Sequence, residues 1–394
     1  MVDLQKKLEE RLLQSINYTM ETSDEEILTE IDTLFLEEPA IRIHTVEERK
    51  KLKEKIFCSL RGLDFLEQLL KDDTITEIMI NGTDMVFVER EGRMEKIQEH
   101  FSSEEKLMQV IGKIAGECNR IVNEVSPILD ARLADGSRVN IVLAPIALNG
   151  PVVTIRRFYN NPVTMEQMIA WNSISREAAE DLRRMVMAGY NIFISGGTGS
   201  GKTTLLNALS GYIPKDERII TIEDSAELKL QDIPNLIRME TRNENVEGCH
   251  AITIRDLIRS SLRMRPDRII VGEVRGAEAV DMLTAFSTGH DGSMSTGHAN
   301  TAKDMLSRLE NMFLMGMDIP LAAIRKQIAS AIDILVHLGR NRDKKRKVLE
   351  IMELDGYVDG EIRMHTLYRY DGNALVKEGE IKNDKKLKAT GLKL

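Results

Sequence analysis

A glycine-rich segment near the middle of the chain has the residue types and spacing of a phosphate-binding loop. Residues 196–203 read G-G-T-G-S-G-K-T and match the pattern G-x-x-x-x-G-K-[ST] in full. Glycine is needed because successive backbone N–H groups must turn toward a phosphate chain through dihedral angles that side chains resist. We expect Lys202 to reach the β- and γ-phosphates of ATP and Thr203 to offer its hydroxyl to Mg²⁺. The residues expected to bind the nucleotide are Gly197, Thr198, Gly199, Ser200, Gly201, Lys202, Thr203 and Thr204.

The segments on both sides of this loop support the same interpretation. Residues 192–194 form an apolar run typical of a buried strand, and residues 205–209 predict a helix that stops at Gly211. The start of that helix would add the partial positive charge of a helix N-terminus to the site. The alternative is a glycine-rich turn that matches the pattern by chance, and the succession of strand, loop and helix disfavours it.

Acidic residues follow two predicted strands downstream of the loop. Residues 218–222 lead into Glu223 and Asp224, and residues 268–272 lead into Glu273. An acid directly after a buried strand beside a phosphate loop can hold Mg²⁺ through water and orient an attacking water molecule. A single acid at a strand end is more often a solvated surface residue. Two at consecutive strand ends favour a catalytic role.

Residues 288–300 are unusually rich in Gly, Ser, Thr and His. We expect this segment to bring His298 and Thr296 near the γ-phosphate, where they would sense it. The alternative is that these histidines only satisfy hydrogen bonds within a tight turn. Zinc binding is disfavoured because no third ligand with good spacing is evident beyond Asp291.

Arginines are a second group of candidate catalytic residues. A guanidinium group that contacts the charge developing on the phosphoryl group accelerates phosphoryl transfer, and such an arginine can come from another domain or subunit. Arg156 and Arg157 end a predicted strand just before Asn160-Asn161-Pro162, a natural break in the chain. They are the best placed to move relative to the phosphate loop. Most other arginines are expected to form salt bridges or to be solvated. Those of interest are Arg138, Arg242, Arg255, Arg259, Arg263, Arg265 and Arg275.

Composition limits the class of protein. At 394 residues the chain has room for two or three domains, and a net charge of −9 argues against a general nucleic-acid binder. Three scattered cysteines fit a reducing cytoplasm. No uncharged apolar stretch reaches membrane-spanning length, and the best candidate, residues 328–338, is short and contains Asp333. The basic run at residues 344–347 is interpreted as a solvated loop, with contact to an anionic membrane surface as the minority alternative.

The pattern of apolar residues divides the chain into four parts. Residues 1–63 predict a three-helix appendage with capping boxes at Ser23 and Thr45, and a coiled dimerisation arm is the alternative. Residues 64–158 predict an α/β domain, with a helix capped by Ser102 and a hairpin turn at residues 135–136. Residues 159–166 predict a linker. Residues 167–394 alternate strands with helices, which implies a mainly parallel sheet that binds ligands at its carboxyl edge. They end, past about residue 345, in a strand-rich extension of uncertain packing.

Four segments together resemble the motifs of the type II and type IV secretion ATPase superfamily, in family order across residues 64–365. Residues 75–82 resemble the opening of its amino-terminal domain, and residues 221–228 its aspartate box. Residues 265–276 resemble its Walker B segment, and residues 288–301 its histidine box. The helical appendage, with D-G-S-R-V-N at residues 135–140 and T-I-R-R-F at residues 154–158, is similar to the CpaF-like branch. That branch serves tight-adherence pili and related archaeal-type machines.

This resemblance implies a RecA-like P-loop ATPase core preceded by a PAS-like α/β domain. It implies a cytoplasmic homo-hexamer that hydrolyses ATP with Mg²⁺ and docks on an inner-membrane platform protein, which would associate it peripherally with the inner face of the membrane. Glu223 and Glu273 would share Mg²⁺ binding through water and water activation, and which of them is the general base stays open. His290 and His298 would take the histidine-box positions, although Gly297 stands where a bulkier apolar residue is expected. Candidate γ-phosphate contacts would be Arg138, Arg156, Arg157 and Arg242.

Two other classes of function share the same core. A RecA-like nucleic-acid translocase is disfavoured by the acidic balance and by the lack of an evident basic and aromatic groove, so no specific nucleic-acid partner is expected. A nucleotide-gated scaffold that barely turns over is disfavoured by intact acids beside an intact loop. The leading hypothesis is a motor that drives pilus assembly or retraction, or secretion.

Overall fold

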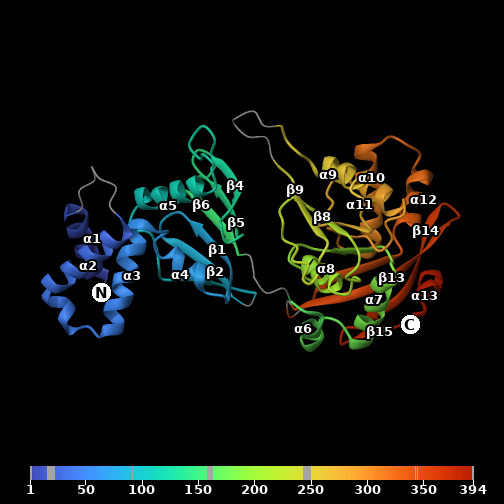
Figure 1. The fold of residues 1–394 in the computed structure, drawn as a ribbon, viewed down its shortest axis with the longest axis horizontal. Helices are drawn as coiled ribbons and strands as arrows, with labels where there is room; N and C mark the ends of the chain where they lie inside the picture. Colours follow the sequence, from blue (N-terminus) through green and yellow to red (C-terminus); the bar gives the residue numbers. More distant parts are fainter. Residues whose placement is uncertain are drawn as a thin grey trace. The chain divides into compact units, whose positions relative to one another are not determined.

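The computed structural model of the chain describes residues 2–15, 23–90, 92–157, 163–242, 250–341, 343 and 345–392. The chain divides into two compact units, Met1–Asn160 and Asn161–Leu394 (Figure 1). The predicted linker 159–166 lies partly outside the described residues. The residues that the structure does not describe include Asn160, Asn161 and Pro162 of this linker, and also Cys249. The linker therefore stays a prediction. No helix in the described part of the chain is both long enough and apolar enough to cross a membrane.

The first unit begins with a small helical bundle. Its elements are α1 (Val2–Ser15), α2 (Asp24–Glu37), the 3₁₀-helix η1 (Pro39–Ile43) and α3 (Val46–Arg61). The capping boxes expected at Ser23 and Thr45 are confirmed, since each side chain accepts from the backbone N–H three residues on and the glutamate there accepts in return. Apolar residues repeating at helical spacing form the bundle core, namely Leu8, Leu12, Ile27, Ile31, Leu34, Ile41, Leu52 and Ile56.

An antiparallel sheet follows the bundle in the same unit. Its strands are β1 (Ile75–Asn81), β2 (Met85–Arg90), β3 (Arg93–Lys96), β4 (Ile128–Arg132), β5 (Arg138–Val142) and β6 (Val152–Arg156), in the order β3-β2-β1-β6-β5-β4. Helices α4 (Leu66–Lys71) and α5 (Glu104–Glu117) share one apolar core with the sheet. The expected cap at Ser102 is wrong: Ser103 accepts from Lys106 N and begins α5. Sequence analysis did not identify β3 or β4.

A mixed sheet forms the centre of the second unit. Its strands are β7 (Ile192–Gly196), β8 (Ile219–Glu223), β9 (Leu236–Glu240), β10 (Arg268–Val271), β11 (Met294–Gly297), β12 (Ile334–Arg340), β13 (Arg346–Val358), β14 (Glu361–Tyr370) and β15 (Leu375–Lys377). Their order is β15-β14-β13-β12-β7-β11-β10-β8-β9. The run from β12 to β9 is parallel, as expected, and β13, β14 and β15 are antiparallel.

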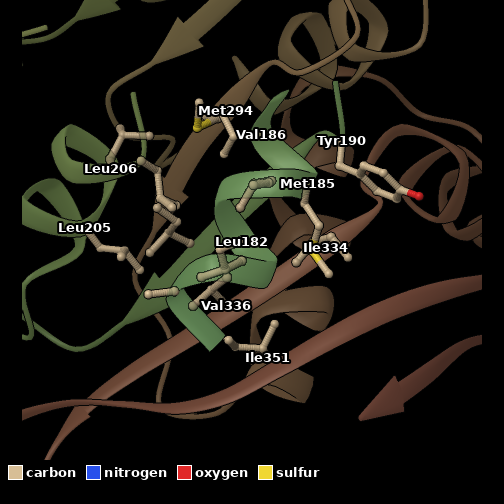
Figure 2. Close-up of a cluster of buried hydrophobic side chains, with 14 of the residues drawn as sticks. Leu182, Met185, Val186, Tyr190, Leu205, Leu206, Met294, Ile334, Val336 and Ile351 are labelled. Atoms are coloured by element: carbon tan, nitrogen blue, oxygen red, sulfur yellow. The ribbon is translucent and has the colours of Figure 1, made fainter. Parts of the chain in front are cut away.

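Helices cover both faces of this sheet. The helices are α6 (Met165–Ala170), α7 (Arg176–Met187), α8 (Lys202–Ser210), α9 (Ile254–Ser261), α10 (Ala279–Phe286), α11 (Ala302–Gly316), α12 (Leu321–Ala331) and α13 (Lys385–Thr390). Residues of α6, α7, α8 and α13 share one core with the sheet, and Figure 2 shows part of it, with Leu182 of α7 near Val336 and Ile351. Residues of α9 to α12 share the core on the other face. Such three-layer packing is typical of α/β folds.

The carboxyl-terminal extension is part of this sheet rather than a separate appendage. Ile351 of β13 and Tyr368 of β14 are buried in the core shared with α7, and the Tyr368 hydroxyl donates to Asp181 Oδ2 at 2.5 Å. Residues 328–338, the best apolar candidate for a membrane span, are instead divided between α12 and β12. The polar residue Asp333 lies in the turn between these two elements.

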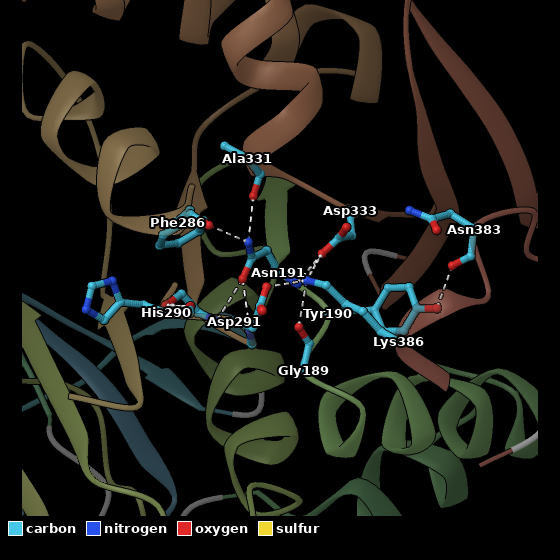
Figure 3. A network of polar contacts seen from close by, with 12 residues as sticks. Gly189, Tyr190, Asn191, Phe286, His290, Asp291, Ala331, Asp333, Asn383 and Lys386 are labelled. Atoms are coloured by element: carbon cyan, nitrogen blue, oxygen red, sulfur yellow. Dashed lines mark hydrogen bonds and ion pairs between the residues drawn. The ribbon is translucent and has the colours of Figure 1, made fainter. Parts of the chain in front are cut away.

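The amino end of β7 is fixed by a buried asparagine (Figure 3). The Asn191 amide nitrogen donates to Phe286 O and Ala331 O, both at 2.9 Å, and Asn191 Oδ1 accepts from Gly292 N at 2.9 Å and Ser293 N at 3.0 Å. Because this one side chain joins α10, α12 and the segment before β11, it holds the start of the strand that leads into the phosphate loop.

Lys386 of α13 bonds the carboxyl-terminal helix to residues around the start of β7, next to Asn191. Its ammonium donates to Asp291 Oδ1 at 2.7 Å, Asp333 Oδ2 at 2.9 Å and Gly189 O at 2.9 Å. The carboxyl-terminal helix therefore belongs to the folded unit that carries β7.

We expect Asn191→Ala to lower the free energy of unfolding of the second unit by about 2–4 kcal/mol, because four buried backbone groups would lose their partner. Trp171, the single tryptophan, lies at the end of α6 and reports on this unit in urea titrations followed by fluorescence. The matched control is Asn383→Ala, because Asn383 is exposed and joins the same network through its backbone carbonyl, which the substitution keeps. Equal shifts of the unfolding midpoint in the two variants would contradict the structural role of Asn191.

Candidate nucleotide-binding and catalytic site

The phosphate loop connects β7 to α8 at the carboxyl edge of the sheet. Gly199 has φ of +67°, in the left-handed region, and a Cβ there would lie 2.7 Å from Arg340 Nη2. A Cβ at Gly196 would lie 2.5 Å from the Leu338 carbonyl oxygen of the neighbouring strand. Beside Gly197, by contrast, a Cβ would meet nothing within 4 Å. The glycines are thus needed where the loop is crowded, and space for a ligand is left at Gly197.

Lys202 opens α8 and is almost buried, with 7% of its surface exposed. Its ammonium donates to Gly196 O and Gly197 O, both at 3.1 Å, and lies 3.2 Å from His298 Nδ1. The charge is therefore directed across the loop, where phosphate oxygens would be bound. The buried hydroxyl of Ser200, which has no hydrogen-bond partner in the described part of the chain, adds a free polar group to the same loop. These residues fit a nucleotide phosphate chain with Mg²⁺.

Glu223 ends β8 and is 3% exposed. Its Oε2 accepts from Glu227 N at 2.6 Å and from Leu228 N at 2.8 Å, while Oε1 is buried and has no hydrogen-bond partner among the described residues. Burial raises the pKa of Glu223 to about 7, although the two backbone bonds oppose the shift. The result is an oriented carboxyl group with one free oxygen and a pKa suited to proton transfer near neutral pH.

Glu273 directly follows the Val271-Gly272 end of β10 and has a more polar environment. Its Oε2 accepts from Arg275 Nη2 at 2.8 Å, and its Oε1 lies 2.6 Å from His298 Nε2. Strands β8 and β10 are hydrogen-bonded neighbours, with Ile222 beside Val271, so the two acids follow adjacent strands. Oε1 of each acid is buried and has no hydrogen-bond partner among the described residues, but Glu273 lies against the basic side chains of His298 and Arg275, whereas the polar contacts of Glu223 are to backbone N–H groups.

His298 connects the phosphate loop to Glu273. Burial is the main cause that lowers the pKa of His298, and the charge of Lys202 acts in the same direction against the opposing effect of Glu273. A neutral ring can accept from the Lys202 ammonium at Nδ1, while Nε2 lies 2.6 Å from Glu273 Oε1, an oxygen that has no hydrogen-bond partner among the described residues. The three side chains therefore form a continuous polar connection from α8 to the end of β10.

The other members of the histidine segment lie elsewhere. Thr296 Oγ1 donates to Gly272 O at 2.8 Å, so its hydroxyl is bound to β10. His290 precedes β11 whereas His298 follows it, and His290 Nδ1 lies 3.1 Å from Ala285 O in the network at the opposite end of the strand (Figure 3). Of the residues predicted from this segment, the structure brings only His298 to the loop lysine.

Three predicted arginines belong to the first unit. Arg138 and Arg156 are opposite each other on β5 and β6, and Arg138 donates to Asp130 at 3.3 Å. Arg156 is exposed. Arg157 is 11% exposed and donates to the carbonyl oxygens of Asp72 and Ile75. Arg157 is thus tied into its own unit, and Arg156 is the more accessible of the two. Their contact with a γ-phosphate stays a prediction.

Arg242 and most other predicted arginines have local partners in the second unit. Arg242 follows β9, is exposed and donates to His250 O at 3.2 Å. Arg255 and Arg259 both pair with Asp281, at 2.6 and 2.9 Å. A γ-phosphate contact by Arg242 therefore also stays a prediction, and the pair on Asp281 fits the expectation that most arginines form salt bridges.

Sequence analysis missed two arginines that lie at the loop. Arg340 donates to Gly199 O from Nε at 3.3 Å and from Nη2 at 3.1 Å, and Arg346 donates to the same oxygen from Nε at 3.1 Å. Arg346 belongs to the basic run 344–347 that we interpreted as a solvated loop. It is exposed but begins β13, and Lys347 is buried in the same strand, so the loop interpretation is wrong for these two residues. The register of β12 beside β7, with Leu338 next to Gly196, carries both arginines to the loop.

A third missed residue, His337, contacts the strand that leads into the loop. His337 Nδ1 is 2.8 Å from Ser195 Oγ, and both side chains are buried. Burial lowers the pKa of His337, which favours the neutral ring. Only the strand order could have identified these contacts, since residues 195 and 337 are far apart in the sequence.

Comparison with known proteins agrees with this geometry. A family model described as Type II/IV secretion system protein matches residues 59–381. A putative conjugal transfer protein of Mycobacterium tuberculosis is 35% identical over 318 residues, which cover 79% of this chain and 90% of that protein. The type IV secretion system protein PtlH of Bordetella pertussis is 32% identical over 323 residues, which cover 75% of this chain and 94% of PtlH.

A solved structure agrees at the level of fold. The crystal structure of the pilus retraction motor PilT with bound ADP has a TM-score of 0.54 and 17% identity, over 83% of this chain and 86% of PilT. At that identity the likeness shows the fold alone, and it confirms the expected RecA-like P-loop core. With the family match and the relatives that share almost their whole length with it, the chain belongs to the type II/IV secretion system protein family, the ATPase superfamily that its motifs resemble.

Proposed function

We propose that this protein is a motor ATPase that hydrolyses ATP with Mg²⁺ to power secretion, or the assembly or retraction of a pilus. The observation that carries the proposal is the connection of the phosphate-loop lysine, through His298, to an acid at a strand end, with a second acid after the adjacent strand. A loop that only binds nucleotide needs neither acid. Family membership supports the same conclusion.

Each residue has a proposed role in hydrolysis. The loop N–H groups and Lys202 bind and orient the triphosphate, and the Thr203 hydroxyl, with Glu223 and Glu273 through water, would hold Mg²⁺, which supplies charge compensation at the phosphates. Glu223 is proposed as the general base, because its free Oε1 and its pKa near 7 suit the acceptance of a proton from water. Glu273 then contributes negative charge beside the metal. His298, which contacts both Glu273 and Lys202, holds these two side chains in position.

The machine that this motor serves is proposed from the sequence resemblance. The CpaF-like phrases at residues 135–140 and 154–158 support a tight-adherence pilus or a related machine. The homologues named for conjugal transfer and type IV secretion support a membrane-bound export machine more generally. We propose a homo-hexamer on the cytoplasmic side of the membrane, bound to an inner-membrane platform protein. Its parts would be residues 1–63, 64–158, 159–166 and 167–394, as expected from the sequence.

Lys202→Ala is expected to abolish ATP turnover while leaving the fold intact, because it removes the charge that faces the β- and γ-phosphates. Phosphate release and circular dichroism are measured on the same preparation, with and without single-stranded DNA. Turnover above about a tenth of the wild-type rate would contradict the assignment, given the orders of magnitude attached to such charge stabilisation. Activity that depends on DNA would favour a nucleic-acid translocase instead.

Hydrolysis is expected to depend on pH through Glu223. A general base must be ionised, so the single-turnover rate should rise with pH through about 7 and level off above it. Glu223→Gln should bind a labelled ATP analogue and lose both the rate and this inflection. Glu273→Gln is the matched comparison, because it should lower the rate and keep the inflection. An unchanged inflection in Glu223→Gln would remove Glu223 as the base.

Hydrolysis is also expected to need an arginine from a neighbouring subunit. Mixing Lys202→Ala with Arg156→Ala should restore some activity if Arg156 acts on the loop of another subunit, because mixed rings then contain sites with both groups intact. Arg156 is chosen because its side chain is exposed, whereas Arg157 is held by backbone carbonyls. The control is Arg93→Ala on the edge strand β3, also exposed, which should be fully active alone. A fully active Arg156→Ala would disprove the role.

A further inference from the structure

The hairpin formed by β12 and β13 presents two arginines at its tip. Arg340 ends β12, Arg346 begins β13, and the two are direct partners across the antiparallel ladder. The turn between them is closed by Asn341 N, which donates to Lys345 O at 3.0 Å, and by Lys345 N, which donates to Asn341 Oδ1 at 2.9 Å. The hairpin is therefore ordered up to the two arginines.

Both arginines are directed at one atom of the phosphate loop. Three N–H groups, two from Arg340 and one from Arg346, donate to Gly199 O at 3.1–3.3 Å. In a trans peptide the carbonyl and the following N–H point in opposite directions. The arginines therefore fix the plane of this peptide, whose N–H, that of Ser200, donates to Gly197 O at 3.3 Å. The hairpin thus sets the orientation of a backbone donor in the phosphate loop.

The arrangement of charge at the hairpin tip is unusual for a purely structural contact. Like charges directly opposite each other on an antiparallel pair are destabilising. Other arginines of this unit are paired with carboxylates, such as Arg268 with Glu217 and Arg325 with Glu310. Within the ranges that the structure describes, no ion pair joins Arg340 to a carboxylate, and a carbonyl oxygen carries only a partial charge. Two exposed guanidinium groups beside a phosphate loop fit an anionic ligand.

We propose that Arg340 and Arg346 form a same-chain anion subsite that binds the phosphate chain of the nucleotide together with the loop. This rests on the proposed function, because it concerns the same nucleotide. This subsite differs from the arginine of a neighbouring subunit proposed above, both in the chain that supplies it and in the quantity that it changes. Arg340 and Arg346 are on β12 and β13 of the same chain as the loop, so they add to nucleotide affinity in each chain, whereas the other arginine acts on the rate.

Equilibrium binding of AMP, ADP and a non-hydrolysable ATP analogue tests the subsite in the full-length protein. The variants are Arg340→Gln, Arg346→Gln and the double change, since glutamine keeps an N–H for Gly199 O and removes the charge. Each single change should raise Kd for ADP and the analogue about tenfold, the scale of one charge-assisted hydrogen bond, and the double change more. The loss should be smaller for AMP, which carries less charge. Arg369→Gln, whose partners are Glu350 and Glu378, is the matched control and should bind like the wild type.

Three outcomes separate the possibilities. Unchanged Kd for ADP and the analogue in both single variants would overturn the subsite, and so would an equal loss for AMP, ADP and the analogue, which would assign the arginines to loop structure alone. Trp171 fluorescence checks folding, and the single variants carry the test if the double variant unfolds. A wild-type protein that binds none of the three nucleotides would instead disprove the proposed function.

Discussion

The structure around the site depends on one constraint, which is that a nearly buried ammonium group must be compensated. Lys202 is 7% exposed, and a charge so far from water is costly unless polar partners surround it. Two loop carbonyls and a histidine nitrogen supply those partners. Because the same ammonium attracts phosphate oxygens, these partners are groups that a nucleotide can replace. The position of Lys202 therefore requires both the glycine-rich loop and a neutral His298.

The sheet topology explains how groups from distant parts of the sequence reach this lysine. The order β12-β7-β11-β10-β8 places the loop strand between β12, which ends at Arg340, and β11, which is followed by His298. Strands β10 and β8 then add the two acids. The carboxyl ends of parallel strands share one edge, so side chains more than a hundred residues apart meet there. The opposite edge is held by Asn191 and Lys386, and His290, predicted as a histidine-box residue, lies in that network.

Features with a local cause could be predicted from the sequence. The phosphate loop, the capping boxes at Ser23 and Thr45, and the acids after β8 and β10 each depend on neighbouring residues and on a known periodicity. Features with a non-local cause could not. The contact of His337 with Ser195 depends on the register of β12 beside β7, across more than a hundred residues. Arg346 lies in a run of basic residues typical of a solvated loop, and only the pairing of β12 with β7 brings it to Gly199.

The two acids illustrate how the environment divides chemistry between identical side chains. Glu223 accepts two backbone N–H groups on one oxygen and has no partner for the other in the described residues, and its burial raises its pKa to about 7. Glu273 lies against two basic side chains: its Oε2 accepts from Arg275, and its Oε1 is 2.6 Å from His298 Nε2 without a hydrogen-bond partner among the described residues. A base needs a free oxygen and a pKa close to the working pH, whereas a group that balances metal charge needs to stay ionised. The geometry therefore favours Glu223 for proton transfer. His298 contacts both Lys202 and Glu273. A change in the contacts of Lys202 at the loop would therefore alter the position of Glu273 through His298.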